Sequence, residues 1–394
     1  MCKFICIYQY FFVPLPRFLN KAMRYLISGG GTGGHIFPAV SIANALKELD
    51  PEAQILFIGA LGRMEMERVP QAGYEIVGLP VRGFNRAQPW KNISVLIDLA
   101  KSIRQVKKII RDFRPDVGVG VGGYASGAAM WAAAQMGIPI LLQEQNGFAG
   151  VTNKILKNKA AKICVAYEGM ERFFPADKII LTGNPVRQNL LNGKAPKREV
   201  INGAATKHLL IIGGSLGART INEAILAGLP ALQQAGIHVV WQTGKVYYEK
   251  IINSEAYKRA IGTINAEGNK PWLEVLPFLS DMPDRYAQAD LVISRAGASS
   301  ISEICLLGKP AILVPSPNVA EDHQTHNAMA LVRKDAAVLV KDCEAADKLI
   351  PTALELIQDD ARLATLHTNV LTLAQRDSAK RIAEEVMALA KKQQ

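Results

Sequence analysis

The stretch of this chain with the clearest chemical potential is a run of glycines with a histidine behind it. Five of the six residues 29–34 are glycine, and His35 follows directly. Glycine lets backbone N–H groups approach a ligand closely, and a helix that starts after such a loop favours an anion. His35 has the right ordinary pKa to act as a general base near neutral pH. The alternative is a helix-start histidine that positions the backbone or binds phosphate.

Two further stretches offer similar chemistry. Residues 213–218, GGSLGA, form a second glycine loop that adds the hydroxyl of Ser215. Residues 294–310 are expected to run from a strand through a turn into a helix, which Ser299 or Ser300 could cap. Glu303 then lies about one turn into this helix. It could complete a capping box, or its carboxylate could accept two hydroxyls of a ribose.

The first loop formally satisfies the dinucleotide fingerprint Gly29-x-Gly31-x-x-Gly34. That fingerprint also requires an acidic residue at the end of the second strand, where it holds a ribose. The second strand here ends in FIGALG and has no acid at its tip. This disfavours a nicotinamide oxidoreductase, and the absence of GxxxxGK[ST] excludes a P-loop.

Short apolar runs that alternate with helical stretches must position these loops. Runs such as 25–28, 55–59 and 117–121 lack polar alternation, which is typical of parallel strands buried on both faces. RYLISGGGTGG and KHLLIIGGSLGA repeat one strand–loop–helix layout about 180 residues apart. We therefore expect an α/β protein with two doubly wound domains, a hinge within 181–200, and a terminal amphipathic helix.

The composition narrows the class of protein. The chain has 394 residues and a net charge of +11, which suggests two domains and an anionic partner. Its five cysteines show no zinc-type pairing, so we expect reduced thiols. No apolar run reaches the length of a membrane span. Residues 1–22 lack a signal-peptide cleavage pattern, and Met23 is the expected functional start, with a weakly membrane-contacting tail as the alternative.

Residues 82–114 carry nine Lys and Arg but only two Asp. One interpretation is a helix that packs its apolar stripe on the core and leaves a solvated basic face. The other adds docking on anionic lipid, with Phe84 and Trp90 as interfacial anchors. The stripe is expected to comprise Ile93, Leu96, Ile97, Ala100, Ile103, Val106 and Ile110.

Several motifs together resemble one family. They occur in the order GGGTGGHIFPA, GGYASG, QEQNGFAGVTNK, GNPVR, GGSLGA, RAGASSISE and HQTHNA, across about residues 23–390. The set is similar to the MurG family of glycosyltransferase family 28.

The resemblance implies a GT-B fold, in which two Rossmann-like parallel-sheet domains face a cleft. It implies an N-terminal acceptor domain at 23–187, a C-terminal donor domain at 188–371, and a helix at 372–394 that returns to the first domain. The implied activity is that of an inverting hexosyltransferase. It would move N-acetylglucosamine from UDP-GlcNAc to the 4-hydroxyl of undecaprenyl-pyrophosphoryl-MurNAc-pentapeptide, converting lipid I to lipid II in peptidoglycan synthesis.

The resemblance also implies a peripheral location on the cytoplasmic face of the inner membrane, an anionic membrane surface and other cell-wall synthesis proteins as partners, and no cofactor. No DxD-like motif is present, so catalysis without a metal is expected. For the base, Glu144 is the second candidate after His35. Tyr124 is expected on the acceptor side, and His323 and His326 are minor candidates. The implied donor-binding residues are Thr32, Gly33, Gly34, Asn146, Arg187, Ser215, Leu279 through its backbone, Ala298, Ser299, Ser300, Ile301, Ser302, Glu303 and Gln324.

One departure from the family is Leu216, where many relatives carry glutamine, so a polar contact is not expected there. Two alternatives remain at this point. Another GT-B transferase could act on a different lipid or small acceptor, although GGYASG and QEQNG match the acceptor side. A nucleic-acid-binding protein is suggested by charge alone, and we expect no nucleic acid as partner.

Overall fold

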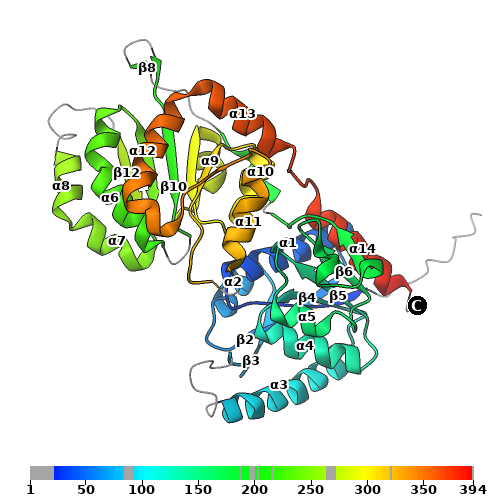
Figure 1. Cartoon of the computed structure of the whole chain (residues 1–394). Helices are drawn as coiled ribbons and strands as arrows, with labels where there is room; N and C mark the ends of the chain where they lie inside the picture. Colours follow the sequence, from blue (N-terminus) through cyan, green and yellow to red (C-terminus); the bar gives the residue numbers. More distant parts are fainter. Residues whose placement is uncertain are drawn as a thin grey trace, which may run out of the picture.

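Two lobes of parallel sheet and helix make up the protein (Figure 1). The computed structural model describes residues 22–83, 92–186, 188–194, 200–201, 204–214, 217–262, 272–319 and 322–392. The predicted roles of residues 1–21, Phe84, Trp90, Arg187, Ser215 and Leu216 therefore lie outside the described residues.

The N-terminal lobe is built on a seven-stranded parallel sheet in the order β3-β2-β1-β4-β5-β6-β7. Its strands are β1 (Arg24–Gly29), β2 (Gln54–Ala60), β3 (Glu75–Leu79), β4 (Val117–Gly122), β5 (Ile140–Glu144), β6 (Lys162–Val165) and β7 (Ile179–Leu181). Its helices are α1 (Gly33–Leu49), α2 (Glu65–Gln71), α3 (Asn92–Phe113), α4 (Tyr124–Gln135) and α5 (Val151–Leu156), with short 3-10 turns η2 (Met170–Arg172) and η3 (Ala176–Lys178).

The C-terminal lobe repeats this plan with a six-stranded parallel sheet in the order β12-β11-β10-β13-β14-β15. Its strands are β10 (His208–Ile212), β11 (His238–Gln242), β12 (Leu273–Leu276), β13 (Leu291–Ser294), β14 (Ala311–Leu313) and β15 (Val338–Leu339). Its helices are α6 (Arg219–Gln234), α7 (Lys245–Ile252), α8 (Glu255–Gly262), α9 (Met282–Gln288), α10 (Ala298–Leu307), α11 (His323–Val332), α12 (Ala345–Gln358) and α13 (Asp360–Leu371). The turns η4 (Gln188–Asn192) and η6 (Asp342–Glu344) and the antiparallel pair β8 (Val200–Ile201) and β9 (Ala204–Ala205) complete it.

Both sheets are buried on both faces, which explains why their strands are continuously apolar in sequence. In β1, for example, Tyr25 and Ile27 pack into one core cluster and Leu26 into the cluster on the opposite face. The strand order reverses between β1 and β4 in one lobe and between β10 and β13 in the other. The predicted pair of doubly wound domains is confirmed, and ligand sites are expected at the carboxyl ends of these strands.

The last helix, α14 (Ser378–Lys391), leaves the C-terminal lobe and packs beside α1 in the N-terminal lobe (Figure 1). Its apolar side chains, including Ile382 and Val386, are fully buried in the same core cluster as Ile36 and Ile42 of α1. The chain therefore crosses between the lobes twice.

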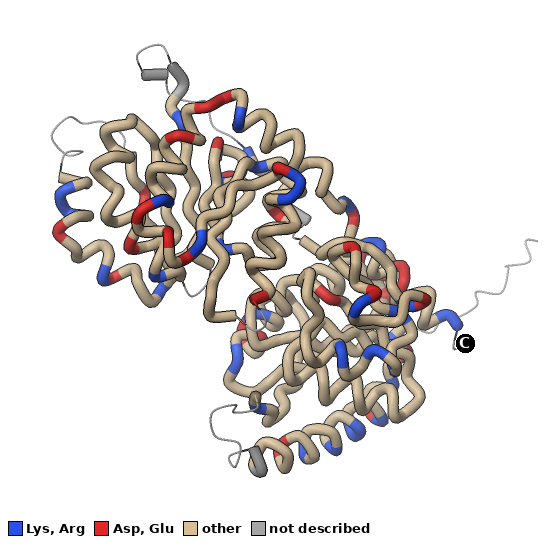
Figure 2. Tube along the Cα trace, viewed as in Figure 1, with Lys and Arg blue, Asp and Glu red and all other residues tan. Residues whose placement is uncertain are grey.

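Helix α3 corrects one detail of the predicted apolar stripe. Val106 and Ile110 are buried as expected, but Leu96 is 54% exposed and Ile97 is 51% exposed. The buried face instead includes Val95, and Leu96 and Ile97 are exposed, as Lys101 and Lys108 are. Lys and Arg positions recur along α3 (Figure 2). Among the helices described, none is both long enough and apolar enough to span a membrane.

Candidate active site

The backbone of the first glycine loop donates a hydrogen bond to a buried carboxylate that the sequence analysis did not predict. Glu65, at the start of α2, is fully buried. Its Oε2 accepts a hydrogen bond from the Gly31 N–H at 2.9 Å, and its Oε1 accepts one from the Ala60 N–H at 3.0 Å. An acid thus does lie at the tip of β2, but the loop backbone occupies it, so it is not open to a ribose.

The glycines of this loop divide into two groups by what their amides bind. The Gly30 N–H donates to Gly122 O, and Gly31, at φ +88°, donates to Glu65. The N–H groups of the next three residues, 32–34, make no hydrogen bond among the described residues. Because α1 begins at Gly33, these amides form the open, positive end of a helix, where an anion is favoured.

His35, in the first turn of α1, has a defined tautomer. Its Nδ1 lies 3.0 Å from Gly30 O, and a carbonyl oxygen only accepts, so Nδ1 carries the proton. In the neutral ring, Nε2 then keeps its lone pair. The Nε2 side of the ring lies against Gly122, where an added Cβ would approach Nε2 to 2.9 Å.

Burial is the largest influence on the His35 pKa and lowers it below the ordinary value. The Gly30 hydrogen bond and the charges of Glu144 and Glu65 raise it, and His323 of the opposite lobe lowers it. The net shift is downward, so the His35 imidazole is neutral at pH 7.

Glu144, the second candidate base, is engaged in shaping its own loop. Its side chain is 2% exposed, and both carboxylate oxygens accept hydrogen bonds. Oε2 accepts from the Gly150 N–H and the Asn153 side-chain amide, both at 2.9 Å, and Oε1 accepts from the Asn146 N–H at 3.2 Å. By accepting these hydrogen bonds, the Glu144 carboxylate organises the loop between β5 and α5.

The acceptor-side candidate Tyr124 begins α4 and is 57% exposed. Its ring lies beside Gly83, where an added Cβ would come within 2.8 Å of the ring carbons. Tyr124 therefore packs against the segment that follows β3 and keeps more than half of its surface exposed.

In the C-terminal lobe, α10 supplies the predicted carboxylate. Glu303 is 8% exposed, and its Oε2 accepts a hydrogen bond from the Tyr286 hydroxyl at 3.1 Å. The N-cap of α10 is Gly297 without a side-chain cap, so the expected capping by Ser299 or Ser300 is wrong. The Ser299 hydroxyl is buried with no partner among the described residues, whereas Ser302 donates to Ala298 O within the helix.

The other residues predicted to bind the sugar donor differ in their burial and in their hydrogen bonds. Leu279 is 1% exposed and packs in the lobe core, so only its backbone can meet a ligand. The Gln324 side chain accepts a hydrogen bond from the Ser316 N–H at 2.9 Å. In the second loop, Gly214 and Gly217 adopt positive φ of +78° and +82°, a conformation that favours glycine.

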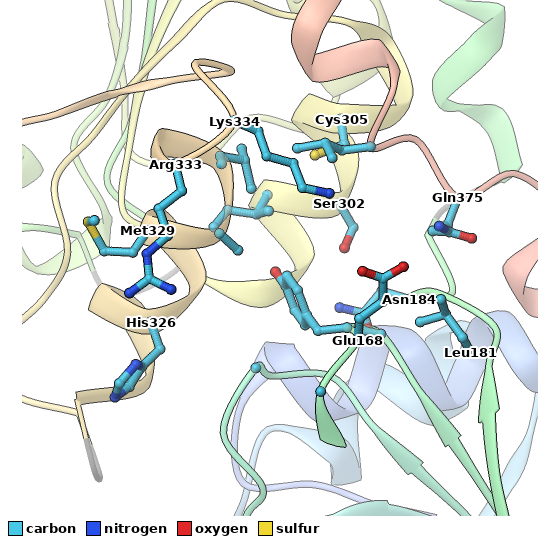
Figure 3. A pocket seen from close by; sticks show the side chains of 18 of the residues that line it. Glu168, Leu181, Asn184, Ser302, Cys305, His326, Met329, Arg333, Lys334 and Gln375 are labelled. Atoms are coloured by element: carbon cyan, nitrogen blue, oxygen red, sulfur yellow. The ribbon is translucent and has the colours of Figure 1, made fainter. Parts of the chain in front are cut away.

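The lobes also enclose a pocket of about 570 Å³ beside this site (Figure 3). Its walls come from α10 and α11 on one side and from the loops after β5, β6 and β7 on the other. Ile301 and Ser302 point into this pocket, and the glycine loop takes no part in it. His326, also in its wall, stacks on Phe148 of the opposite lobe at a ring distance of 5.8 Å.

A second residue that sequence reasoning missed joins the lobes directly. Asn327 of α11 is fully buried. Its Oδ1 accepts from the Gly147 N–H at 3.0 Å, and its Nδ2 donates to Asn146 Oδ1 at 3.2 Å and to Ala296 O at 3.3 Å. It stands in the motif HQTHNA, but its partner lies 181 residues away, so no local pattern gave its contact.

Comparisons with known proteins agree with this geometry. Residues 25–165 match the glycosyltransferase family 28 N-terminal domain, and residues 208–385 match the glycosyltransferase family 28 C-terminal domain. A protein from Bacteroides fragilis is 59% identical over 376 residues, covering 94% of this chain and 97% of the relative. It is named UDP-N-acetylglucosamine–N-acetylmuramyl-(pentapeptide) pyrophosphoryl-undecaprenol N-acetylglucosamine transferase. A Porphyromonas gingivalis protein of the same name is 50% identical over 374 residues, covering 93% and 96%.

Solved structures give the same result for the fold. MurG from Acinetobacter baumannii superposes with a TM-score of 0.72 at 26% identity, covering 93% of this chain and 99% of that one. The UDP-GlcNAc 2-epimerase from Neisseria meningitidis bound to UDP-GlcNAc reaches a TM-score of 0.63 at 15% identity over 93% and 100%, a likeness of fold alone. The predicted GT-B fold is confirmed, and the chain belongs to glycosyltransferase family 28.

Proposed function

We propose that this chain transfers N-acetylglucosamine from UDP-GlcNAc to the 4-hydroxyl of undecaprenyl-pyrophosphoryl-MurNAc-pentapeptide, converting lipid I to lipid II. The relatives that match it at 50–59% identity over almost their full length carry this activity in their names. The observation that supports the mechanism is that helix α1 of one lobe contacts helix α10 of the other. His35 and the open amides of residues 32–34 belong to the start of α1, and the proposed nucleotide site belongs to the start of α10.

Each half-site has a distinct task in the proposed reaction. His35 Nε2 takes the proton from the acceptor hydroxyl, whose oxygen then attacks the anomeric carbon of the donor. The bond from that carbon to UDP breaks, and UDP leaves with the electron pair. Attack from the face opposite the leaving group inverts the anomer.

The charge that develops on UDP needs preorganised positive potential. We propose that the start of α10 supplies it, together with the second glycine loop, and that the buried Ser299 hydroxyl, which has no partner among the described residues, is a further donor. The Glu303 carboxylate is proposed to accept the ribose hydroxyls, with Tyr286 fixing its orientation. The open amides of residues 32–34 are proposed to meet the sugar and phosphates from the opposite lobe.

The proposal is tested by transfer of labelled N-acetylglucosamine from UDP-GlcNAc to a lipid I analogue, with a chelator present. We expect transfer that continues in chelator. Folded protein that transfers no sugar would refute the proposed function. Transfer that stops in chelator and resumes with a divalent cation would refute the metal-independent mechanism alone.

We further propose that the enzyme works as a peripheral protein on an anionic membrane, docked through α3. Lys101, Arg104 and Lys108 are exposed on α3, and the same helix exposes the apolar side chains of Leu96 and Ile97. An apolar edge flanked by cations is the arrangement that binds an acidic lipid surface.

Flotation on vesicles that contain acidic lipid tests this surface. Changing Lys101, Lys107 and Lys108 together to Glu should abolish co-flotation. The matched control changes three exposed lysines of the C-terminal lobe to Glu, which alters net charge equally and should leave flotation intact. Equal flotation of both variants would refute docking through α3. The control lysines are Lys250, Lys258 and Lys348.

A further inference from the structure

The buried side chain of Asn327 forms hydrogen bonds to loops of both lobes beside the proposed site. Its three hydrogen bonds reach Gly147 and Asn146 of the N-terminal lobe and Ala296, which follows β13 in the C-terminal lobe. A group fully withdrawn from water gains most from such complete pairing.

These bonds fix the orientation of two carboxamides without ambiguity. The Gly147 N–H can only donate, so the atom of Asn327 that faces it is the oxygen. Ala296 O can only accept, so the other atom of Asn327 is the nitrogen. That nitrogen also faces Asn146, which must therefore present its own oxygen to it.

The consequence for Asn146 is that its Nδ2 turns away from Asn327. One of its hydrogens points toward Glu144 Oε1 at 3.4 Å, and the other has no acceptor among the described residues. Asn146 is only partly buried, and this second N–H is the group that we infer to be available to a ligand. The site therefore offers a hydrogen-bond donor at this point and not an acceptor.

We propose that Asn327 is a positioning residue that sets sugar recognition by holding the Asn146 amide as a donor toward an oxygen of the transferred sugar. The inference rests on the proposed function, because it takes the sugar of UDP-GlcNAc as the ligand beside Asn146. According to this inference, the sugar subsite is complete only when Asn327 forms its hydrogen bonds to the N-terminal lobe. The nucleotide subsite on α10 does not require those hydrogen bonds.

The test compares the binding of UDP with that of UDP-GlcNAc by calorimetry. Asn327→Asp keeps an acceptor for Gly147 but removes the donor, so Asn146 turns over and presents its oxygen to the sugar. We expect UDP-GlcNAc binding to weaken about tenfold, as for one lost hydrogen bond, while UDP binding stays within about twofold. Asn369→Asp, the same change at a hydrogen-bonded asparagine of α13, should alter neither.

A double-mutant cycle separates positioning from mere support. Asn327→Ala should weaken UDP-GlcNAc binding in the wild-type background and have no further effect in an Asn146→Ala background. Equal losses of UDP and UDP-GlcNAc binding, or an Asn327→Ala loss that persists without the Asn146 side chain, would overturn the positioning role. Wild-type protein that binds neither ligand would refute the proposed function, and this inference with it.

Discussion

The carboxylate beneath the first glycine loop gives the sharpest prediction. Glu65→Gln preserves the shape of the side chain but replaces one carboxylate oxygen with an NH2 group. Either the Gly31 or the Ala60 N–H then faces a donor instead of an acceptor. A hydrogen bond to a charged group contributes about 1.5–3 kcal/mol, and a buried N–H without a partner costs a similar amount. The loop should therefore open more easily by at least about 2 kcal/mol.

Hydrogen exchange measured by mass spectrometry detects this opening. A loss of about 2 kcal/mol corresponds to roughly 30-fold faster exchange in the peptide that covers residues 28–34. Glu67→Gln, which changes an exposed glutamate on the same helix, is the matched control and should leave exchange unchanged. If both variants exchange alike in this peptide, Glu65 does not hold the loop and the reasoning from its two hydrogen bonds is wrong.

Three further predictions concern the reaction. Since burial lowers the His35 pKa, kcat/KM should fall only below about pH 6.5, where the ring gains a proton. The folded protein should lose stability over the same range, because the unfolded ring binds protons more readily. An acid limb of the pH profile that is unchanged in His35→Ala would exclude His35 as the base. Gly122→Ala would bring a Cβ within 2.9 Å of His35 Nε2 and should lower kcat about 100-fold with little change in the KM for UDP-GlcNAc, and an unchanged kcat would contradict this. Glu303→Gln should raise the KM for UDP-GlcNAc about tenfold, whereas Tyr286→Phe, which removes only the orienting hydroxyl, should raise it less; equal effects would contradict a direct ribose contact.

The sequence predicted the lobes and their loops because those features are local. A strand buried on both faces is apolar throughout, and a glycine-rich turn before a helix needs particular residues in a short window. Glu65 was missed for the opposite reason. The dinucleotide fingerprint has its acid at the end of the second strand, whereas Glu65 lies five residues beyond Ala60, on α2, and its side chain returns to the Ala60 N–H.

Contacts between distant segments lay beyond any local pattern. Nothing in the spacing of HQTHNA connects Asn327 with Asn146, because the contact exists only once two separately folded sheets face each other. The period of α3 predicted a helix with an apolar side, but its apolar residues cover more than one face. Burial of Val95 and exposure of Leu96 depend on where α4 packs, which the period does not specify.

The return of α14 to the first lobe has a consequence for biosynthesis. The N-terminal end of a chain emerges first from the ribosome. The core of the N-terminal lobe nevertheless lacks Ile382, Val386 and their neighbours until α14 has emerged near the end of synthesis. The second lobe has all its own strands well before then. The lobe that is made first is therefore the last to be completed, and the face of α1 that α14 covers stays open to chaperones throughout synthesis.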